Sequence, residues 1–340
     1  MPTEIIATLG GASQRASVLA AMAQEGMDWA RLNFSHENEA AHAGRLQLVR
    51  SLNRRQGTAI KAMLDLKGHE VRVRADQPQA LEKGQQVLLS ASPGPGRVVL
   101  QPPLLLSKLR RGARILMDDG FVELVVQSLS PEGASCLVTS DCVLKPGKAV
   151  STAQLPPLHA LPGEDKQALR FAVQHRVEAV ALSHVGDAAM VEEARALLGP
   201  GILIVSKIEN AHAVRALREI IAASDAIMVA RGDLGINLPL EEVPPLQEKI
   251  LRRCRAAAIP AIVATQMLES LTAHARPTRA EANDVYTAVR QGASGVMLSA
   301  ETAVGEHPPL AVRWMRLLAE RAEQENARMA RPTLVPVRAR

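Results

Sequence analysis

The segments ILIVSKIEN (residues 202–210) and DAIMVARGDLG (residues 225–235) each read as an apolar strand that ends in charged residues. Side chains alternate along a strand, so Lys207 and Glu209 leave the same face at the end of the first segment. The second segment brings Asp233 to a similar position. A lysine and two carboxylates at neighbouring strand ends are suited to a complex of Mg²⁺ and phosphate.

Strand-like and helix-like patterns alternate on both sides of these segments and total eight strand–helix units. Eight parallel units close into a (β/α)8 TIM barrel, an α/β fold whose active site lies at the carboxyl ends of the strands. A doubly wound open sheet is the alternative. It needs fewer units, and no GxGxxG motif opens the chain.

The alternation breaks once, after the third strand, where short β-like runs are separated by turn signals such as SPGPG and SPEG. This stretch predicts a small β-barrel-like lid domain inserted into the barrel. The expected divisions are barrel residues 1–73, the lid 74–154, barrel residues 155–325 and a tail 326–340.

The composition argues against a nucleic-acid-binding protein. The chain of 340 residues is 47% hydrophobic but only 2% aromatic, which predicts an aliphatic core and argues against stacking on nucleic-acid bases. The net charge of +5 comes from scattered basic residues, and this favours a solvated basic surface over a nucleic-acid footprint.

The cysteines and the termini indicate a reducing compartment. Cys136, Cys142 and Cys254 lack metal-ligand spacing, and an odd count fits free thiols. The amino terminus runs directly into a strand, and no apolar run reaches membrane-spanning length. We therefore expect a cytoplasmic protein with no membrane partner.

Polar residues follow the other predicted strands as well. A structural interpretation competes at each place, because a lone Lys207–Glu209 pair is commonly a salt bridge, and Asn33 and Ser35 could cap the next helix. If the barrel closes, these side chains converge. The strand-end residues are Arg31, Asn33, Ser35, Asp65, Lys67, Glu70, Arg72, Thr265 and Ser299.

Together these motifs resemble the pyruvate kinase family. The resemblance covers residues 3 to about 325, follows the family's order, and is specific for the barrel but weak across the insert. The segments that carry it are GMDWARLNFSH (26–36), LDLKGHEVR (64–72), SKIEN (206–210), MVARGDLG (228–235), ATQMLES (264–270), RPTRAE (276–281) and LSAET (298–302).

The resemblance implies roles for the charged residues. Glu209 and Asp233 would bind Mg²⁺ (or Mn²⁺) bridging to phosphoenolpyruvate or pyruvate. Lys207 would neutralise the transferred phosphoryl group, with Arg31 and Arg72 clamping phosphate oxygens, since phosphoryl transfer depends on positioning and electrostatics.

It also implies roles for the substrate side. Thr265 would act in protonation of the enolpyruvate, through water, and the backbone of Gly232 would hold the substrate carboxylate. Ser299 joins Arg31 and Lys207 among the substrate-binding positions.

A potassium site and a nucleotide site follow from the same resemblance. Oxygens of Asn33, Ser35, Asp65 and Leu66 would hold K⁺, and the family's glutamate at the place of Glu70 goes with potassium dependence. The nucleotide-binding positions are Asn33, His36, Arg72, Asp119 and Lys148.

Several positions depart from the family's pattern. Gly11 replaces a proline of the nucleotide pocket, and His184 and Gly186 replace a phenylalanine and an arginine after the fourth strand. Asn237 stands where a glutamate usually follows RGDLG, and Ala300 replaces a glycine.

The resemblance implies a phosphotransferase of glycolysis that forms pyruvate and ATP from phosphoenolpyruvate and ADP. We expect no allosteric regulation through a carboxyl-terminal domain, because the chain stops after the eighth helix, and a homodimer through the barrel. One alternative is a related metal–enolate enzyme that uses another acceptor or acts on a 2-oxo acid. Another is a non-catalytic sensor of phosphoenolpyruvate or pyruvate.

Overall fold

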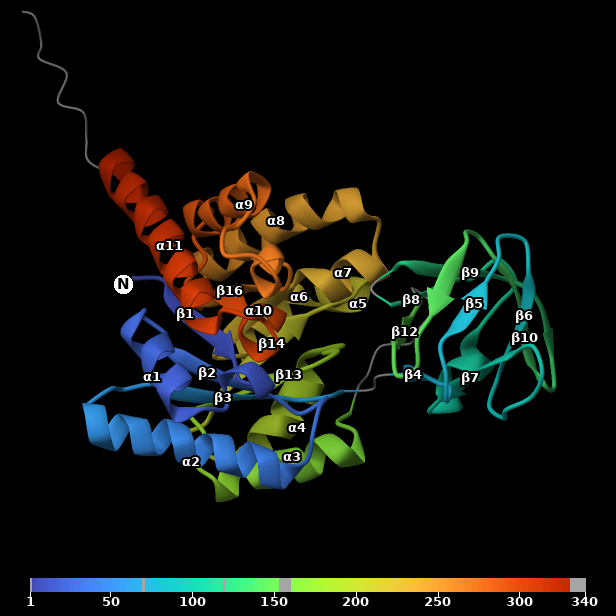
Figure 1. The fold of residues 1–340 in the computed structure, drawn as a ribbon, viewed down its shortest axis with the longest axis horizontal. Coiled ribbons are helices and arrows are strands. Elements are labelled where there is room, and N and C mark those ends of the chain that lie inside the picture. The colour runs from blue at the N-terminus through green and yellow to red at the C-terminus, as the bar shows by residue number, and fades with distance from the viewer. Residues whose placement is uncertain (1, 69–70, 119, 153–159, 331–340) are drawn as a thin grey trace, which may run out of the picture.

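The computed structural model describes residues 2–68, 71–118, 120–152 and 160–330, and these form two closed barrels (Figure 1). In the larger barrel eight parallel strands follow one another around the ring in chain order, which confirms the predicted TIM barrel. Its strands are β1 (Glu4–Thr8), β2 (Trp29–Asn33), β3 (Lys61–Asp65), β13 (Ala179–Leu182), β14 (Leu203–Ile208), β15 (Ala226–Ala230), β16 (Ala261–Ala264) and β17 (Gly295–Leu298).

Helices alternate with these strands, and most of them cover the outside of the barrel (Figure 1). They are α1 (Ala16–Gln24), α2 (Glu39–Gln56), α3 (Gly163–Gln174), α4 (Ala188–Leu198), α5 (Ala211–Arg215), α6 (Leu217–Ala223), α7 (Arg231–Asn237), α8 (Val243–Ala256), α9 (Arg279–Arg290), α10 (Ala300–Ala303) and α11 (Pro308–Ala330). Short 3-10 turns occur at Gly11–Ser13, Pro103–Lys108, Leu240–Glu242 and Glu269–Thr272. None of the helices in the described ranges is long and apolar enough to cross a membrane.

The last helix is longer than expected. The sequence predicts a tail from residue 326, but α11 continues without a break to Ala330. Buried residues such as Met315 and Ala319 pack it onto the barrel. The helix therefore extends into the range expected for the tail, and the division at residue 326 stays a prediction.

The core of the larger barrel has two layers. Aliphatic side chains between strands and helices form the outer layer, and a smaller cluster that includes Ile6, Met63 and Val205 fills the interior. Since Val205 faces inward, Lys207 and Glu209 share its face by strand alternation. Because of this alternation, both side chains point toward the mouth of the barrel.

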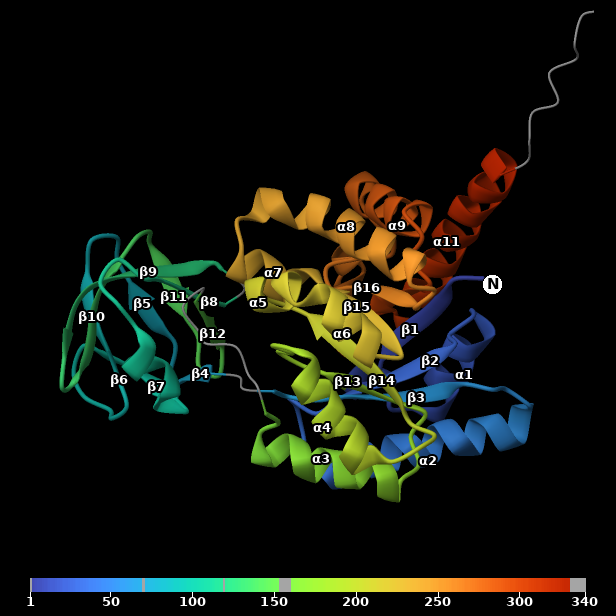
Figure 2. The same ribbon diagram turned by 180° about the vertical axis from the view of Figure 1, so that it is seen from behind.

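The second barrel follows β3 and lies beside the first, as both views show (Figures 1 and 2). Seven strands close in the order β10-β6-β7-β4-β12-β8-β9, and β5 and β11 form a separate pair. The strands are β4 (Val71–Arg74), β5 (Gln79–Leu81), β6 (Gln86–Ser90), β7 (Arg97–Gln101), β8 (Arg114–Met117), β9 (Val122–Ser130), β10 (Gly133–Val138), β11 (Cys142–Leu144) and β12 (Ala149–Ser151). We call this unit the inserted barrel.

The inserted barrel begins earlier than the sequence suggests. The expected division between residues 73 and 74 falls inside β4, which pairs with β7 and β12. Strand β4 carries the alternating sequence VRVR with Val71 and Val73 buried in the core of the inserted barrel. We propose residues 71–151 as the inserted unit; the expected end at residue 154 lies outside the described residues.

Candidate active site

The helix after Glu209 begins immediately, because Asn210 caps it. The side chain of Asn210 accepts a hydrogen bond from the backbone N–H of Ala213 and so starts α5 immediately after Glu209. Asp65 is the last residue of β3, and Thr265 is the first residue after β16. The carboxyl ends of these parallel strands share one rim of the barrel, which brings the side chains together.

Lys207 is the centre of a buried polar cluster. Its Nζ lies 2.8 Å from Glu209 Oε1 and 3.1 Å from Asp65 Oδ1, and it donates to Ser183 Oγ at 2.7 Å. Lys207 is 9% exposed, and Asp65 and Glu209 are 0% and 1% exposed. All three donor hydrogens of the ammonium group therefore have partners inside the protein.

Arg31 completes the charge balance of this cluster. Its Nε donates to Asp65 Oδ2 at 2.7 Å, and its Nη1 donates to Thr8 Oγ1 at 2.9 Å. Two cations, Arg31 and Lys207, thus face two carboxylates, Asp65 and Glu209. Buried charges are tolerated when they are paired and hydrogen-bonded in this way.

The pKa values follow from that pairing. Burial alone would lower the pKa of Lys207, but the neighbouring carboxylates, led by Asp65 and then Glu209, outweigh it and raise the pKa. Burial would raise the pKa of Asp65 and of Glu209, and the attraction of Lys207 reverses this in both. All three groups are charged at neutral pH, and a charged ammonium is what a phosphoryl group in transfer needs nearby.

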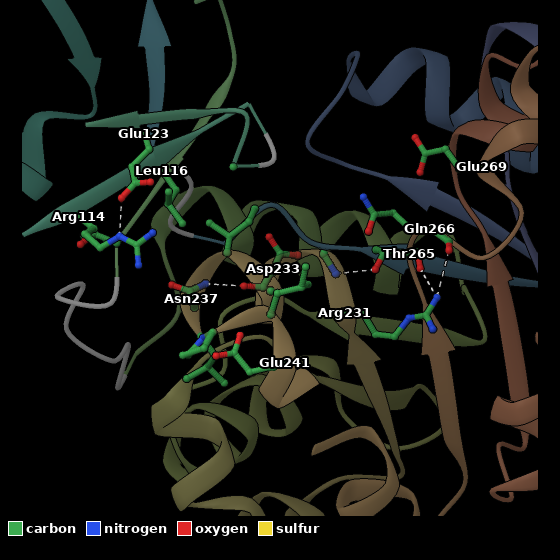
Figure 3. A pocket seen from close by; sticks show the side chains of 18 of the residues that line it. Arg114, Leu116, Glu123, Arg231, Asp233, Asn237, Glu241, Thr265, Gln266 and Glu269 are labelled. Carbon is green, nitrogen blue, oxygen red and sulfur yellow. Dashed lines mark hydrogen bonds and ion pairs between the residues drawn. The ribbon is translucent and has the colours of Figure 1, made fainter. Parts of the chain in front are cut away.

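The opposite wall of the mouth is built around Thr265. Thr265 and Gln266 have φ angles of 71° and 50°, in the left-handed region that non-glycine residues rarely adopt. Arg231 Nη2 donates to the carbonyl of Thr265 at 2.7 Å and to that of Gln266 at 3.2 Å, while its Nη1 binds Asp284 at 2.6 Å. The Arg231 side chain therefore holds both strained residues in place (Figure 3).

Gly232 holds the other end of Thr265. Its backbone N–H donates to Thr265 Oγ1 at 2.7 Å, and that hydroxyl donates to the carbonyl of Ala264 at 2.5 Å. The amide expected to bind a substrate carboxylate thus has a protein partner in this structure. Ser299 Oγ, at the end of β17, is buried and has no hydrogen-bond partner among the described residues.

A cavity of about 1010 Å³ lies along this second wall and reaches the inserted barrel (Figure 3). Its lining includes Asp233, Asn237, Thr265 and Ser299 from the larger barrel and Arg114 and Glu123 from the inserted barrel. Its size is sufficient for a small anionic substrate with room beside it.

The predicted divalent metal ligands fit by chemistry but do not form a closed cage. Glu209 and Asp233 supply hard carboxylate oxygens of the kind that Mg²⁺ and Mn²⁺ take. Over residues 2–68, 71–118, 120–152 and 160–330, no group of three or more His, Cys, Asp or Glu could hold a metal ion. Two carboxylates leave further positions for substrate oxygens or water, as a catalytic magnesium site requires.

The predicted potassium ligands cluster near Asp65 and Lys207, at the ends of β3, β13 and β14, which form the first wall of the mouth. Asn33 Oδ1 accepts from the backbone N–H of Ser35 at 3.2 Å, and the carbonyl of Leu66 accepts from Ser183 Oγ at 2.6 Å. Asp65 is bound to Arg31 and Lys207. Mostly neutral oxygens with one carboxylate suit a monovalent cation, and in this structure they are occupied by protein donors.

The predicted nucleotide residues fall into two groups. Asn33 and His36 belong to the larger barrel, whereas Arg72 and Lys148 lie on the inserted barrel, where Arg72 is paired with Ala149 across β4 and β12. Arg72 Nη1 donates to the carbonyl of Gly147 at 2.6 Å, and Lys148 Nζ lies 2.5 Å from Asp118 Oδ1. Asp119 and Glu70 lie outside the described residues.

Three residues near the site were not predicted from the sequence. His184 donates its backbone N–H to Glu209 Oε2 at 2.6 Å, and its Nδ1 lies 3.3 Å from the same oxygen. Arg231 anchors Thr265, and Asn237 contacts the backbone of Glu209. The departures from the family's pattern at His184 and Asn237 were the available signals.

Comparison with known proteins matches most of this chain to one family. The pyruvate kinase barrel domain matches residues 1–312. The chain is 42% identical over 343 residues to human pyruvate kinase PKLR, covering 94% of the chain and 60% of that protein. It is 37% identical over 334 residues to pyruvate kinase from Geobacillus stearothermophilus, covering 95% and 57%. With pyruvate kinase from Corynebacterium efficiens the identity is 40% over 332 residues, covering 95% and 70%.

Proposed function

Because the chain belongs to the pyruvate kinase family, we propose that it transfers a phosphoryl group from phosphoenolpyruvate to ADP, giving pyruvate and ATP. It spans 57% and 60% of the length of the Geobacillus and human relatives, so their activity is carried over as a proposal. The observation that supports it best is the Lys207 ammonium, held between Asp65 and Glu209 at the mouth of the barrel.

In the proposed reaction the bond between phosphorus and the enol oxygen breaks, and a terminal oxygen of ADP bonds to phosphorus. The enolate then takes a proton on its methylene carbon. Lys207 stabilises the charge on the phosphoryl oxygens in transfer, and Arg31 supplies a second fixed cation beside it. Both cations are already oriented by Asp65, so little reorganisation is needed when charge develops.

Glu209 and Asp233 would hold a divalent cation, Mg²⁺ or Mn²⁺, which when bound polarises substrate oxygens and offsets their charge. The chain's own contribution is to keep the Glu209 carboxylate ionised. For Glu209, burial is outweighed by Lys207, so its pKa lies below the usual range.

Thr265 and Ser299 belong to the protonation side of the site. The Thr265 hydroxyl donates to the Ala264 carbonyl, so it reaches a methylene carbon through a water molecule rather than directly. Ser299 Oγ is buried without a partner among the described residues, which supports a role in holding that water or the substrate.

Potassium would bind at Asn33, Ser35, Asp65 and the Leu66 carbonyl. Asp65 is already compensated by Arg31 and Lys207, so the neutral oxygens of the other three residues would supply most of the binding. Asn33, His36, Arg72 and Lys148 remain the predicted nucleotide contacts. A homodimer through the barrel stays a prediction.

A coupled assay of pyruvate formation tests this proposal. We expect turnover of phosphoenolpyruvate that requires ADP and Mg²⁺ and increases with K⁺. Turnover without ADP would favour an enzyme with another acceptor. Binding of phosphoenolpyruvate with Mg²⁺ but no turnover under any of these conditions would favour a sensor and contradict the proposal.

A further inference from the structure

Asn237 joins three segments that carry or adjoin the candidate metal ligands. It is the last residue of α7, and its Nδ2 donates to the carbonyl of Asp233 at 2.8 Å and to that of Glu209 at 3.1 Å. Its Oδ1 accepts from Ser151 Oγ at 3.2 Å. Asn237 lines the cavity together with Asp233, as Figure 3 shows.

The chemistry of the partners fixes the orientation of this amide. Two carbonyl oxygens require a donor, and the Ser151 hydroxyl can donate to the amide oxygen. Reversing the amide would set its oxygen against two carbonyl oxygens. A carboxylate or an apolar side chain could not make the two donated bonds, so the amide is the group that satisfies this position.

The two carbonyls belong to the two acids that would share one metal ion. Glu209 follows β14 and Asp233 lies in α7, so no regular strand or helix bonding joins their backbones. The Nδ2 group of Asn237 bonds to both, which fixes one backbone relative to the other. Metal ligands must be held to about half an ångström, and the groups that hold them commonly matter as much as the ligands.

Ser151 extends this link into the inserted barrel. It is the last residue of β12, which pairs with β4 and β8. A displacement of β12 therefore acts on the Asn237 amide and through it on the backbone at both acids. The hydrogen bond between the Ser151 and Asn237 side chains thus connects the inserted barrel to the backbone of the metal ligands.

We propose that Asn237 is a positioning residue that sets the spacing of Glu209 and Asp233 and couples it, through Ser151, to the position of the inserted barrel. The proposal rests on the proposed function, because it takes these two carboxylates as the divalent metal ligands. It assigns a task to a side chain that bonds to the backbone carbonyls of the two acids.

Binding of Mn²⁺ alone, followed by electron paramagnetic resonance of the free ion, tests the first half. Asn237→Leu keeps the side-chain size and neutrality but removes both donors, and we expect the Mn²⁺ dissociation constant to rise about tenfold or more. The matched control is Asn53→Leu, because Asn53 likewise donates to a carbonyl, of Ile60, and accepts from a hydroxyl, of Thr58, away from the cavity. The control should lower the melting temperature without changing Mn²⁺ affinity.

Hydrogen exchange of Ser151→Ala tests the second part of the proposal, the coupling to the inserted barrel. This test does not depend on whether Asn237→Leu folds. We expect Mn²⁺ to slow backbone exchange across β12 in the unaltered protein and to lose this effect in Ser151→Ala, with Mn²⁺ affinity changed less than about twofold. Equal slowing in both proteins would overturn the coupling.

The outcomes separate this inference from the proposed function. If Asn237→Leu binds Mn²⁺ within about twofold of the unaltered protein, the positioning role is wrong while the proposed function stands. If the unaltered protein binds no Mn²⁺, the metal site of the proposed function fails and this inference fails with it.

Discussion

The two walls of the barrel mouth are held together in different ways. The wall at β3, β13 and β14 is a closed network of charges, with Lys207 bound to Asp65, Ser183 and Glu209. The wall at β15 and β16 has few charges in contact and instead relies on backbone groups, with Arg231 holding the carbonyl of Thr265. One wall is positioned by electrostatics and the other by local backbone geometry.

This difference predicts different responses to substitution. In a buried charge network, removing one member leaves its partners uncompensated, so stability and activity fall together. In a strained loop that is held by side-chain bonds, removing an anchor moves the reacting group while the fold survives. Substitutions on the two walls should therefore separate effects on stability from effects on turnover.

Lys207→Met should have the largest effect. It removes the cation beside the transferred group, and we expect pyruvate formation to fall by about 10³-fold or more. It also leaves Glu209 without its cation, which should destabilise the fold by about 3–5 kcal/mol without unfolding it. Steady-state assays and chemical denaturation measure the two effects.

Lys166→Met is the matched control for the charge network. Lys166 pairs with Glu193 at 2.7 Å, but both side chains are substantially exposed. We expect a loss of about 1 kcal/mol or less and unchanged turnover. Undiminished turnover in Lys207→Met would refute the role given to that lysine.

Arg231→Met should have the next largest effect, which we expect as a lower turnover rate. The strained carbonyls of Thr265 and Gln266 lose their donor, and a small displacement of Thr265 should lower kcat about 10²-fold with little change in the KM for phosphoenolpyruvate. Arg255→Met removes a comparable bond, to the carbonyl of Gln291, on the outside of the barrel. If both variants behave alike, Arg231 has no special role at Thr265.

Asp165→Asn should change stability alone and leave turnover unaffected, and its effect should depend on pH. Asp165 lies beside the first wall, where its Oδ1 accepts from the Gly68 N–H at 3.2 Å, but its Oδ2 has no hydrogen-bond partner among the described residues. Burial raises its pKa from the ordinary 3.8 to about 6. It is thus the counterexample to the compensated acids Asp65 and Glu209.

The sign of the pH dependence follows from that shift. The folded protein binds this proton more tightly than the unfolded chain, so the stability contributed by Asp165 is complete below about pH 4 and is lost as the pH rises through about 6. Two pKa units correspond to about 3 kcal/mol. Thermal denaturation should find Asp165→Asn more stable than the unaltered protein at pH 8, with the difference vanishing near pH 4; a less stable variant at pH 8 would contradict it.

The sequence predicted the larger barrel well because its signals are local and repeated. Alternation of strands and helices and the position of the insertion are both confirmed. The start of the inserted barrel was missed because the VRVR segment has the same period whether it ends one sheet or begins another. Only its pairing with β7 and β12 distinguishes the two.

For the site, the sequence predicted which side chains converge but not how they are held. Strand parity brought Lys207, Glu209 and Asp65 to one rim, and the structure has them in contact. The tasks of Arg231 and Asn237 depend on backbone carbonyls of distant residues, and no residue pattern records which carbonyls lie nearby. The same holds for the left-handed conformation of Thr265.

The pairing of β4 with β12 brings the beginning and the end of the inserted barrel together. The strand that brings the chain into the inserted barrel lies next to the strand that takes it out, with Val71 opposite Val150. The two ends of the inserted barrel therefore lie next to each other, and a short turn in place of the inserted barrel would leave the larger barrel uninterrupted.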